Sequence, residues 1–84
     1  MAKRVAFTGH AKAELRAIPQ PAAIQILRTL ARFLASEEGN VKRLQGVEPP
    51  LYRLRTQDHR VIFRHLGDDL IEVTRVRDRK DAYR

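Results

Sequence analysis

The fold is decided by residues 52–63, which read YRLRTQDHRVIF. Apolar and basic side chains alternate on both sides of the polar segment Thr56-Gln57-Asp58. A two-residue period is that of a strand with one buried face, so the stretch predicts two strands joined by a turn at Gln57-Asp58. Burial explains Leu54, Val61 and Phe63 on one face. It does not explain why the other face carries arginine so consistently.

Similar patterns predict the remaining elements. Arg4–Phe7 is expected to be a short strand, and Thr8 is placed to cap a helix from about His10 to Ile18. A second helix is expected from about Pro21 to Ser36, with Gly39 as the C′ residue that ends it. Val41–Leu44 is expected to be extended, and three strands are expected after it, at Leu51–Arg55, His59–Leu66 and Leu70–Val76.

The second helix shows the 3.6-residue period of an amphipathic helix. Four positions follow that period and are expected to face the core: Ile24, Leu27, Ala31 and Leu34. Three more apolar positions widen the stripe: Ile26, Leu30 and Phe33.

Alternation along the strands assigns two faces to the sheet. The apolar face consists of Tyr52, Leu54, Val61, Phe63, Ile71 and Val73. The opposite face consists of Arg53, Arg55, Arg60, Arg64, Glu72 and Thr74. Short turns make neighbouring strands antiparallel. The sequence therefore predicts an α+β fold, in which an N-terminal αα-hairpin packs on one face of a small, mainly antiparallel β-sheet and the arginine face stays open.

Length and charge limit the class of protein and its partners. With 84 residues, the chain is expected to form one domain, residues 1–84. Its 17 basic and 10 acidic residues give a net charge of +7, which favours a polyanion such as nucleic acid. No stretch is apolar enough to span a bilayer, and the N-terminus lacks the apolar region of a signal peptide. A cytoplasmic protein without membrane association is expected.

Several common kinds of site do not fit. The chain has no cysteine, and His10, His59 and His65 lie on three different elements, so no metal site is expected. Each histidine is expected at the surface or in a turn. A single serine, Ser36, argues against a Ser-His-Asp hydrolase, and four scattered glycines argue against a phosphate-binding loop. No cofactor is expected.

The arginine cluster is the remaining candidate site, and it suits RNA. Arginine matches phosphate with a planar fork of donors, and tyrosine or histidine can stack on an unpaired base. Metal-independent RNA cleavage needs little more, because the neighbouring 2′-hydroxyl is the nucleophile and the protein orients it, neutralises charge and moves protons. The competing interpretation is a solvated sheet face with a compositional bias toward arginine.

A resemblance to a known family favours the RNA interpretation. The C-terminal half reads LYRLRTQDHRVIF and then LIEVTRVRDRKDAYR, which resembles RelE-type toxins of the RelE/ParE superfamily of type II toxin–antitoxin pairs. The segment FTGHAKAELRAIPQPAAIQIL looks like the first strand and helical hairpin of that family. The resemblance covers nearly the whole chain. It implies the RelE-like fold of microbial ribonuclease-type toxins.

The same resemblance implies an activity and partners. The activity would be ribosome-dependent, metal-independent cleavage of translated mRNA in the A site, which inhibits translation and arrests growth. The partners would be an antitoxin encoded in the same operon, the ribosome with its 16S rRNA, and mRNA. The toxin–antitoxin complex would also bind operator DNA.

The resemblance also assigns site residues, which are Arg53, Arg55, Arg60, Arg79, Tyr83 and, as a candidate, His59. Arg79 would stabilise charge on the phosphate or the leaving oxygen, and Tyr83 would stack on the substrate base. In the best-known branch the position of Arg53 is a lysine, proposed as general base. Arginine stays protonated in proteins, so Arg53 is expected to bind a phosphate instead. Histidine suits acid–base work near neutral pH, although His59 could also be a turn residue that caps or stacks.

Two other functions are compatible with the sequence. A ParE-like toxin of the same superfamily would share the fold and inhibit DNA gyrase without cutting RNA. Alternatively, the missing lysine is compatible with a non-catalytic module that binds nucleic acid or an antitoxin, or with a decayed toxin.

Overall fold

The computed structural model describes residues 4–78, which form two helices and five strands. Along the chain these are β1 (Arg4–Phe7), α1 (Gly9–Ala17), α2 (Gln20–Ser36), β2 (Asn40–Arg43), β3 (Tyr52–Arg55), β4 (His59–His65) and β5 (Leu70–Asp78). Each element predicted from the sequence is present, with bounds that differ by at most two residues at either end. No helix between residues 4 and 78 is long and apolar enough to cross a bilayer.

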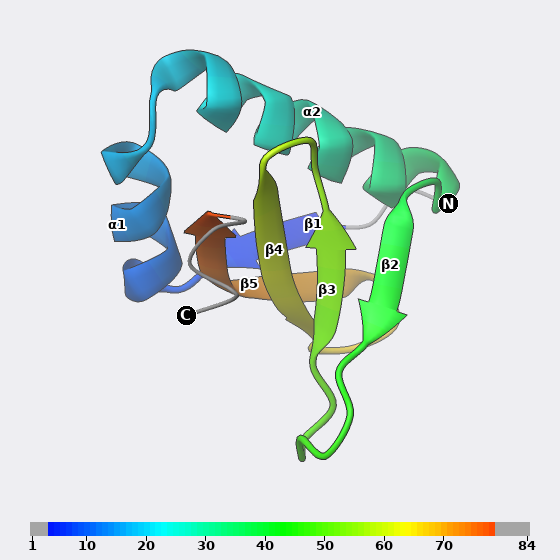
Figure 1. Cartoon of the computed structure of the whole chain (residues 1–84). Coiled ribbons are helices and arrows are strands. Elements are labelled where there is room, and N and C mark those ends of the chain that lie inside the picture. Colours follow the sequence, from blue (N-terminus) through cyan, green and yellow to red (C-terminus); the bar gives the residue numbers. More distant parts are fainter. Residues whose placement is uncertain (1–3, 79–84) are drawn as a thin grey trace.

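The five strands form one sheet in the order β1-β5-β4-β3-β2. β1 pairs with β5 in parallel, and the other three pairs are antiparallel. In Figure 1, α1 lies at the β1 and β5 side of the sheet and α2 extends toward β2. Residues of both helices join the same core as the apolar face of the sheet. The predicted α+β architecture is therefore confirmed.

The ends of the helices follow local chemistry, with one correction. The Thr8 side chain accepts a hydrogen bond from the backbone N–H of Ala11, so its predicted role as N-cap is confirmed. Gly39, however, is not the C′ residue of α2. Glu37 takes the left-handed conformation there, with φ of 60°, and its N–H donates to the carbonyl of Phe33. Gly39 has φ of +151° and lies so close to Leu54 that a Cβ would meet that side chain at 2.8 Å.

The core contradicts part of the stripe predicted for α2. Its buried residues are Ala11, Ile26, Leu30, Phe33, Leu54, Val61, Phe63, Ile71, Val73 and Val76. Of the four α2 positions expected to face inward, Ile24 and Leu27 are instead 41% and 45% exposed, and Ala31 is exposed as well. Seven apolar positions cover so much of this helix that the period alone does not choose the buried arc. Packing chooses it, since the Phe33 and Phe63 rings meet with centroids 5.5 Å apart.

A β-bulge in β5 shifts the alternation of faces. Ile62 on β4 pairs with Arg75, and the next residue, Phe63, pairs with Val73, so Thr74 is the extra residue. The Thr74 hydroxyl donates to the carbonyl of Ile62. Beyond the bulge the parity of β5 is reversed, so Val76 enters the core and the arginines on either side of it join the open face.

Candidate nucleic-acid interface

Three arginines lie next to one another across the open face of the sheet. Arg55 on β3 is directly opposite Arg60 on β4, and Arg60 is directly opposite Arg77 on β5. We call these three residues the arginine row. Residues opposite each other on neighbouring strands have Cα atoms about 5 Å apart, so the row spans about 10 Å. Their chain neighbours Leu54, Val61 and Val76 are buried, so the row faces away from the helices.

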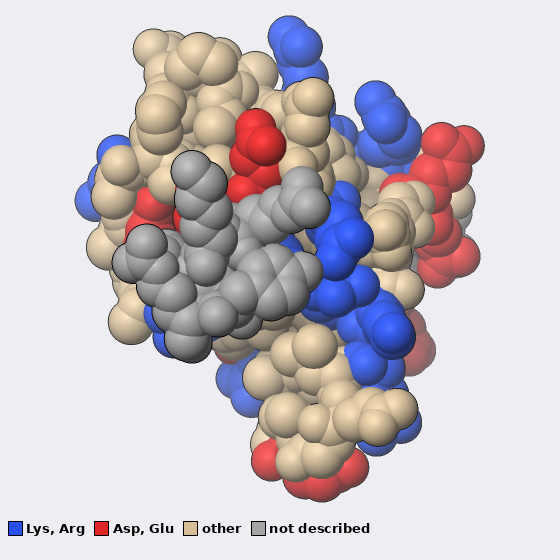
Figure 2. Space-filling model, viewed as in Figure 1, with Lys and Arg blue, Asp and Glu red and all other residues tan. Residues whose placement is uncertain are grey.

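A second cross-strand set lies beside the arginine row. Lys42 on β2 is opposite Arg53 on β3, and Arg53 is opposite Ile62. We call Lys42 and Arg53 the flanking pair. Figure 2 shows a band of lysine and arginine side chains running down this face, over the strands at the centre of Figure 1. By strand pairing, the five cations of the row and the flanking pair are neighbours on this face of the sheet, and together we call them the basic surface.

This arrangement opposes folding, because like charges placed directly opposite on a sheet destabilise it by up to about 1 kcal/mol per pair. Within residues 4–78, no carboxylate lies within ion-pair distance of Arg55 or Arg77. Other arginines do have acidic partners, in the pairs Arg4–Asp69, Arg43–Glu48, Arg64–Glu72 and Arg75–Glu14. Within the described residues the charges of Arg55 and Arg77 therefore have no acidic partner, and a bound polyanion would relieve the repulsion along the row.

His59 lies on the opposite face of the sheet from the arginine row. Its side chain is 7% exposed, and its Nε2 atom lies 3.9 Å from Oδ2 of Asp78. Its backbone N–H donates to the hydroxyl of Thr56, and its carbonyl accepts from the Thr56 N–H and hydroxyl. The prediction of a surface or turn histidine is therefore wrong for His59, because strand parity places this side chain beside the core. His10 and His65 are exposed, as predicted.

Two of the predicted site residues, Arg79 and Tyr83, lie outside the described residues. The structure brings together Arg53, Arg55 and Arg60 and does not bring His59 to them. In the part of the chain that the structure describes, no three histidine, aspartate or glutamate residues gather where they could hold a metal ion.

Sequence reasoning missed two members of the basic surface, Arg77 and Lys42. Strict alternation from Ile71 and Val73 assigns Arg77 to the core face, and only the bulge at Thr74 reverses that assignment. The available signal was the sequence Arg75-Val76-Arg77, in which an apolar residue between two arginines indicates a buried valine. Lys42 was missed because the register of β2 on β3, which places Lys42 opposite Arg53, depends on the length of the loop between these strands.

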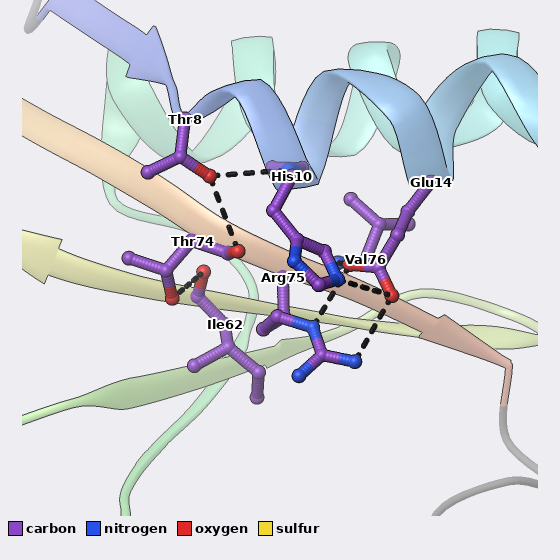
Figure 3. A network of polar contacts seen from close by, with 8 residues as sticks. Thr8, His10, Glu14, Ile62, Thr74, Arg75 and Val76 are labelled. Carbon is purple, nitrogen blue, oxygen red and sulfur yellow. Dashed lines mark hydrogen bonds and ion pairs between the residues drawn. The ribbon is translucent and has the colours of Figure 1, made fainter.

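The edge of β5 that carries Arg77 is held by α1 (Figure 3). β1 ends at Phe7, so beyond Val73 side chains from the α1 region replace a neighbouring strand. The Thr8 hydroxyl donates to the carbonyl of Thr74, and Oε1 of Glu14 accepts from the N–H of Val76 at 2.8 Å. Because these backbone groups would otherwise lack a partner, the two side chains extend the sheet edge.

Glu14 also forms a two-point contact with Arg75. Nε and Nη2 of Arg75 donate to the two carboxylate oxygens at 3.1 and 3.2 Å, and the His10 ring lies 3.9 Å away. Burial alone would raise the pKa of the Glu14 carboxyl. The hydrogen bonds from Arg75 and Val76, together with the nearby positive charges, outweigh burial and hold this pKa below its ordinary value.

We expect Glu14→Gln to lower the free energy of unfolding at neutral pH by about 1–2 kcal/mol, since it weakens charge-assisted hydrogen bonds. A carboxyl whose pKa is lower in the folded than in the unfolded chain stabilises the fold at pH values above its unfolded pKa of about 4 to 4.5. This stabilisation is lost as the pH falls through the pKa of the folded state. The difference between wild type and variant should therefore be constant from pH 6 to 8 and shrink toward pH 3.

Urea unfolding at several pH values measures this difference. Glu38→Gln is the matched control, because it removes the same charge from an exposed residue after α2 and should change stability by less than about 0.5 kcal/mol. A Glu14→Gln penalty that persists undiminished at pH 3 would contradict the assigned role of the carboxylate charge.

The chain is similar to known proteins both in sequence and in fold. The family model described as ParE toxin of type II toxin-antitoxin system, parDE, matches residues 5–83. No match was found among curated proteins.

Solved structures of toxin–antitoxin complexes share the fold. The match in the archaeal RelE–RelB complex from Pyrococcus horikoshii OT3 is 25% identical, with a TM-score of 0.73 over 94% of this chain and 97% of that chain. The match in the RelB–RelE complex from Methanococcus jannaschii is 21% identical, with a TM-score of 0.72 over 93% of this chain and 94% of that chain. The match in the toxin–antitoxin complex RelBE2 from Mycobacterium tuberculosis is 19% identical, with a TM-score of 0.71 over 94% of this chain and 100% of that chain.

Proposed function

The chain belongs to the ParE toxin family of type II toxin–antitoxin systems, within the RelE/ParE superfamily, and from this premise we propose that it is a ribosome-dependent endoribonuclease. Its substrate is translated mRNA in the ribosomal A site, and its effect is inhibition of translation and growth arrest. The observation that carries this proposal is the arginine row, in which Arg55, Arg60 and Arg77 are cross-strand neighbours on the open face of the sheet; Arg55 is exposed, and Arg60 and Arg77 are half-buried. A cross-strand row of like charges fits a substrate with closely spaced phosphates.

The proposed reaction is an internal transfer at one phosphate. The 2′-oxygen bonds to phosphorus, the bond from phosphorus to the 5′-oxygen breaks, and a 2′,3′-cyclic phosphate remains on the upstream fragment. One proton leaves the 2′-hydroxyl and one is delivered to the 5′-oxygen. Negative charge increases on the phosphorane oxygens, where the row would stabilise it by charge-assisted hydrogen bonds.

The arginines of the row cannot accept the proton, because arginine stays protonated. In this proposal, water removes the 2′ proton, and the positive field of the row and the flanking pair lowers the cost of the oxyanion. His59 faces the core, so its proposed part is to hold the end of β5 through Asp78. Arg79 and Tyr83 keep the roles implied by the family resemblance, which are charge stabilisation and stacking on the substrate base.

The proposed partners follow from the family. The solved relatives are complexes of a toxin with an antitoxin, which supports an antitoxin partner encoded in the same operon. We propose that the antitoxin blocks the arginine row, and that the toxin–antitoxin complex binds operator DNA. The ribosome would supply the message and contacts to 16S rRNA.

Inhibition of DNA gyrase is the second candidate function, and the matching family model is the observation that favours it. The two functions differ in what is damaged in the cell. A nuclease leaves cut messages and intact DNA supercoiling, whereas a gyrase inhibitor leaves intact messages and causes DNA damage.

Inducible expression followed by primer extension on a reporter message distinguishes these functions. We expect growth arrest and new 5′ ends within the translated region. The same reporter without its start codon is the control and should stay intact, because cutting needs the ribosome. Intact messages combined with inhibited supercoiling by purified gyrase would contradict the nuclease proposal and support the second candidate.

A further inference from the structure

A cavity of about 170 Å³ lies where the loop between β2 and β3 rejoins the sheet. It is lined by Pro49, Pro50, Tyr52, Arg64 and His65. Pro49 and Pro50 come from the loop, while the other residues come from the adjoining ends of β3 and β4. None of these residues belongs to the arginine row or the flanking pair, so the cavity is a separate feature.

The rings in the cavity wall are held in fixed orientations. Tyr52 stacks on the buried ring of Phe63, with centroids 5.6 Å apart and an interplanar angle of 22°. His65 meets Tyr52 edge-on, with centroids 5.0 Å apart and an angle of 76°. Tyr52 is thus supported by the core, and His65 projects from it at the exposed rim. Such a wall of aromatic and proline rings presents flat apolar surfaces, which suit a planar ligand.

Arg64 adds a fixed cationic group to this wall. Its Nε donates to Oε1 of Glu72 at 2.8 Å, which orients the guanidinium plane. A planar guanidinium stacks on nucleobases and donates hydrogen bonds in its own plane. The wall therefore combines ring surfaces with a donor fork, which is the usual chemistry of a site for an unpaired base.

The cavity is also close to the basic surface. Tyr52 and Arg55 are three residues apart on β3, which corresponds to about 10 Å along the strand. Arg53 of the flanking pair directly follows Tyr52 in the chain. Tyr52 lies on the helix-facing side of the sheet and Arg64 on the open face, so the cavity lies at the end of β3 and β4 where the two faces meet. An RNA backbone that lies on the row, continues along β3 past Arg53 and turns over this end of the sheet would bring a neighbouring nucleotide to the cavity.

We propose that the cavity binds one unpaired nucleobase of the RNA whose backbone lies on the arginine row. This inference rests on the proposed function and adds a base-specific contact to a surface that otherwise recognises phosphates. Phosphate contacts position a nucleic acid without reading its sequence, whereas a base pocket discriminates among nucleotides. The cavity is therefore a determinant of where the message is cut.

Fluorescence anisotropy with labelled hexaadenylate tests the proposal directly. The probes are the intact RNA and six versions that each lack the base at one position. For the wild-type chain, we expect removal of one particular base to weaken binding about tenfold, the usual effect of losing one stacked base. His65→Ala should weaken binding of the intact RNA about tenfold and cancel the effect of that base. His65→Phe should restore both the affinity for the intact RNA and the effect of removing that base, because the ring surface is retained.

Arg55→Gln is the matched control, and it should weaken binding of all seven RNAs by a similar factor. A wild-type chain that is insensitive to every missing base, or a base effect that persists in His65→Ala, would overturn the base pocket while leaving the phosphate surface intact. If the wild-type chain binds no RNA at low salt, the proposed function fails as well. His65 is exposed, and thermal melting checks that the variants are folded.

Discussion

Replacing Arg60 by glutamine is expected to lower the rate of mRNA cutting about 100-fold, the usual cost of removing one group that stabilises charge in a transition state. Arg60 is the central member of the arginine row, opposite both Arg55 and Arg77. The same substitution relieves two like-charge contacts, so the free energy of unfolding should not fall by more than about 1 kcal/mol. A large loss of activity with little change in stability is the expected result for a functional surface.

Primer extension measures the cutting, and urea unfolding measures the stability. Arg28→Gln on α2 is the matched control, since it removes the same charge from an exposed residue outside the basic surface. It should leave cutting within about twofold of wild type if the row acts through local contacts rather than net charge. Equal losses in both variants would mean that overall charge, and not the row, determines activity.

Leu30→Ala is expected to lower the free energy of unfolding by about 3 kcal/mol, because it leaves a cavity in a core that also lacks disulfides. Leu27→Ala, three residues earlier on the same helix, should cost less than about 1 kcal/mol. Leu30 is 2% exposed and Leu27 is 45% exposed. The two substitutions remove the same atoms, so the difference reports only which side of α2 faces the sheet.

Chemical unfolding of both variants under the same conditions provides the comparison. Similar losses for the two substitutions would show that Leu27 is buried in solution, either in the core or against another molecule. A second measurement at a tenfold lower protein concentration separates these cases, because burial against another molecule depends on concentration.

Much of the fold could be predicted from the sequence because its signals are local. The hairpin around Thr56-Gln57-Asp58 has alternating faces on both sides of a short turn, which sets both pairing and register. Thr8 caps its helix through a contact three residues away, so its role also depends on neighbouring residues. The same alternation was enough to place Arg53, Arg55 and Arg60 together on the open face.

The corrections concern features that distant contacts decide. The apolar stripe of α2 is wide, and contact with Phe63 selects its buried arc. The bulge at Thr74 is stabilised by Thr8, 66 positions away, and it alone turns Arg77 toward the row. The prediction of a surface or turn position is wrong for His59, because its burial and its contact with Asp78 are set by the pairing of β4 with β5. Because these contacts join residues far apart in the chain, the periodicity of the sequence does not predict them.

Cleavage of a defined message on purified ribosomes tests the central claim most directly. The message carries one chosen codon in the A site and is prepared in two forms, all-ribose and with 2′-deoxyribose at the nucleotide expected to be cut. We expect the toxin to cut the all-ribose message, leaving a 2′,3′-cyclic phosphate or 3′-phosphate, and to leave the deoxy message intact. Equal cutting of both forms would contradict attack by the 2′-hydroxyl, and no cutting of either form would contradict the nuclease function.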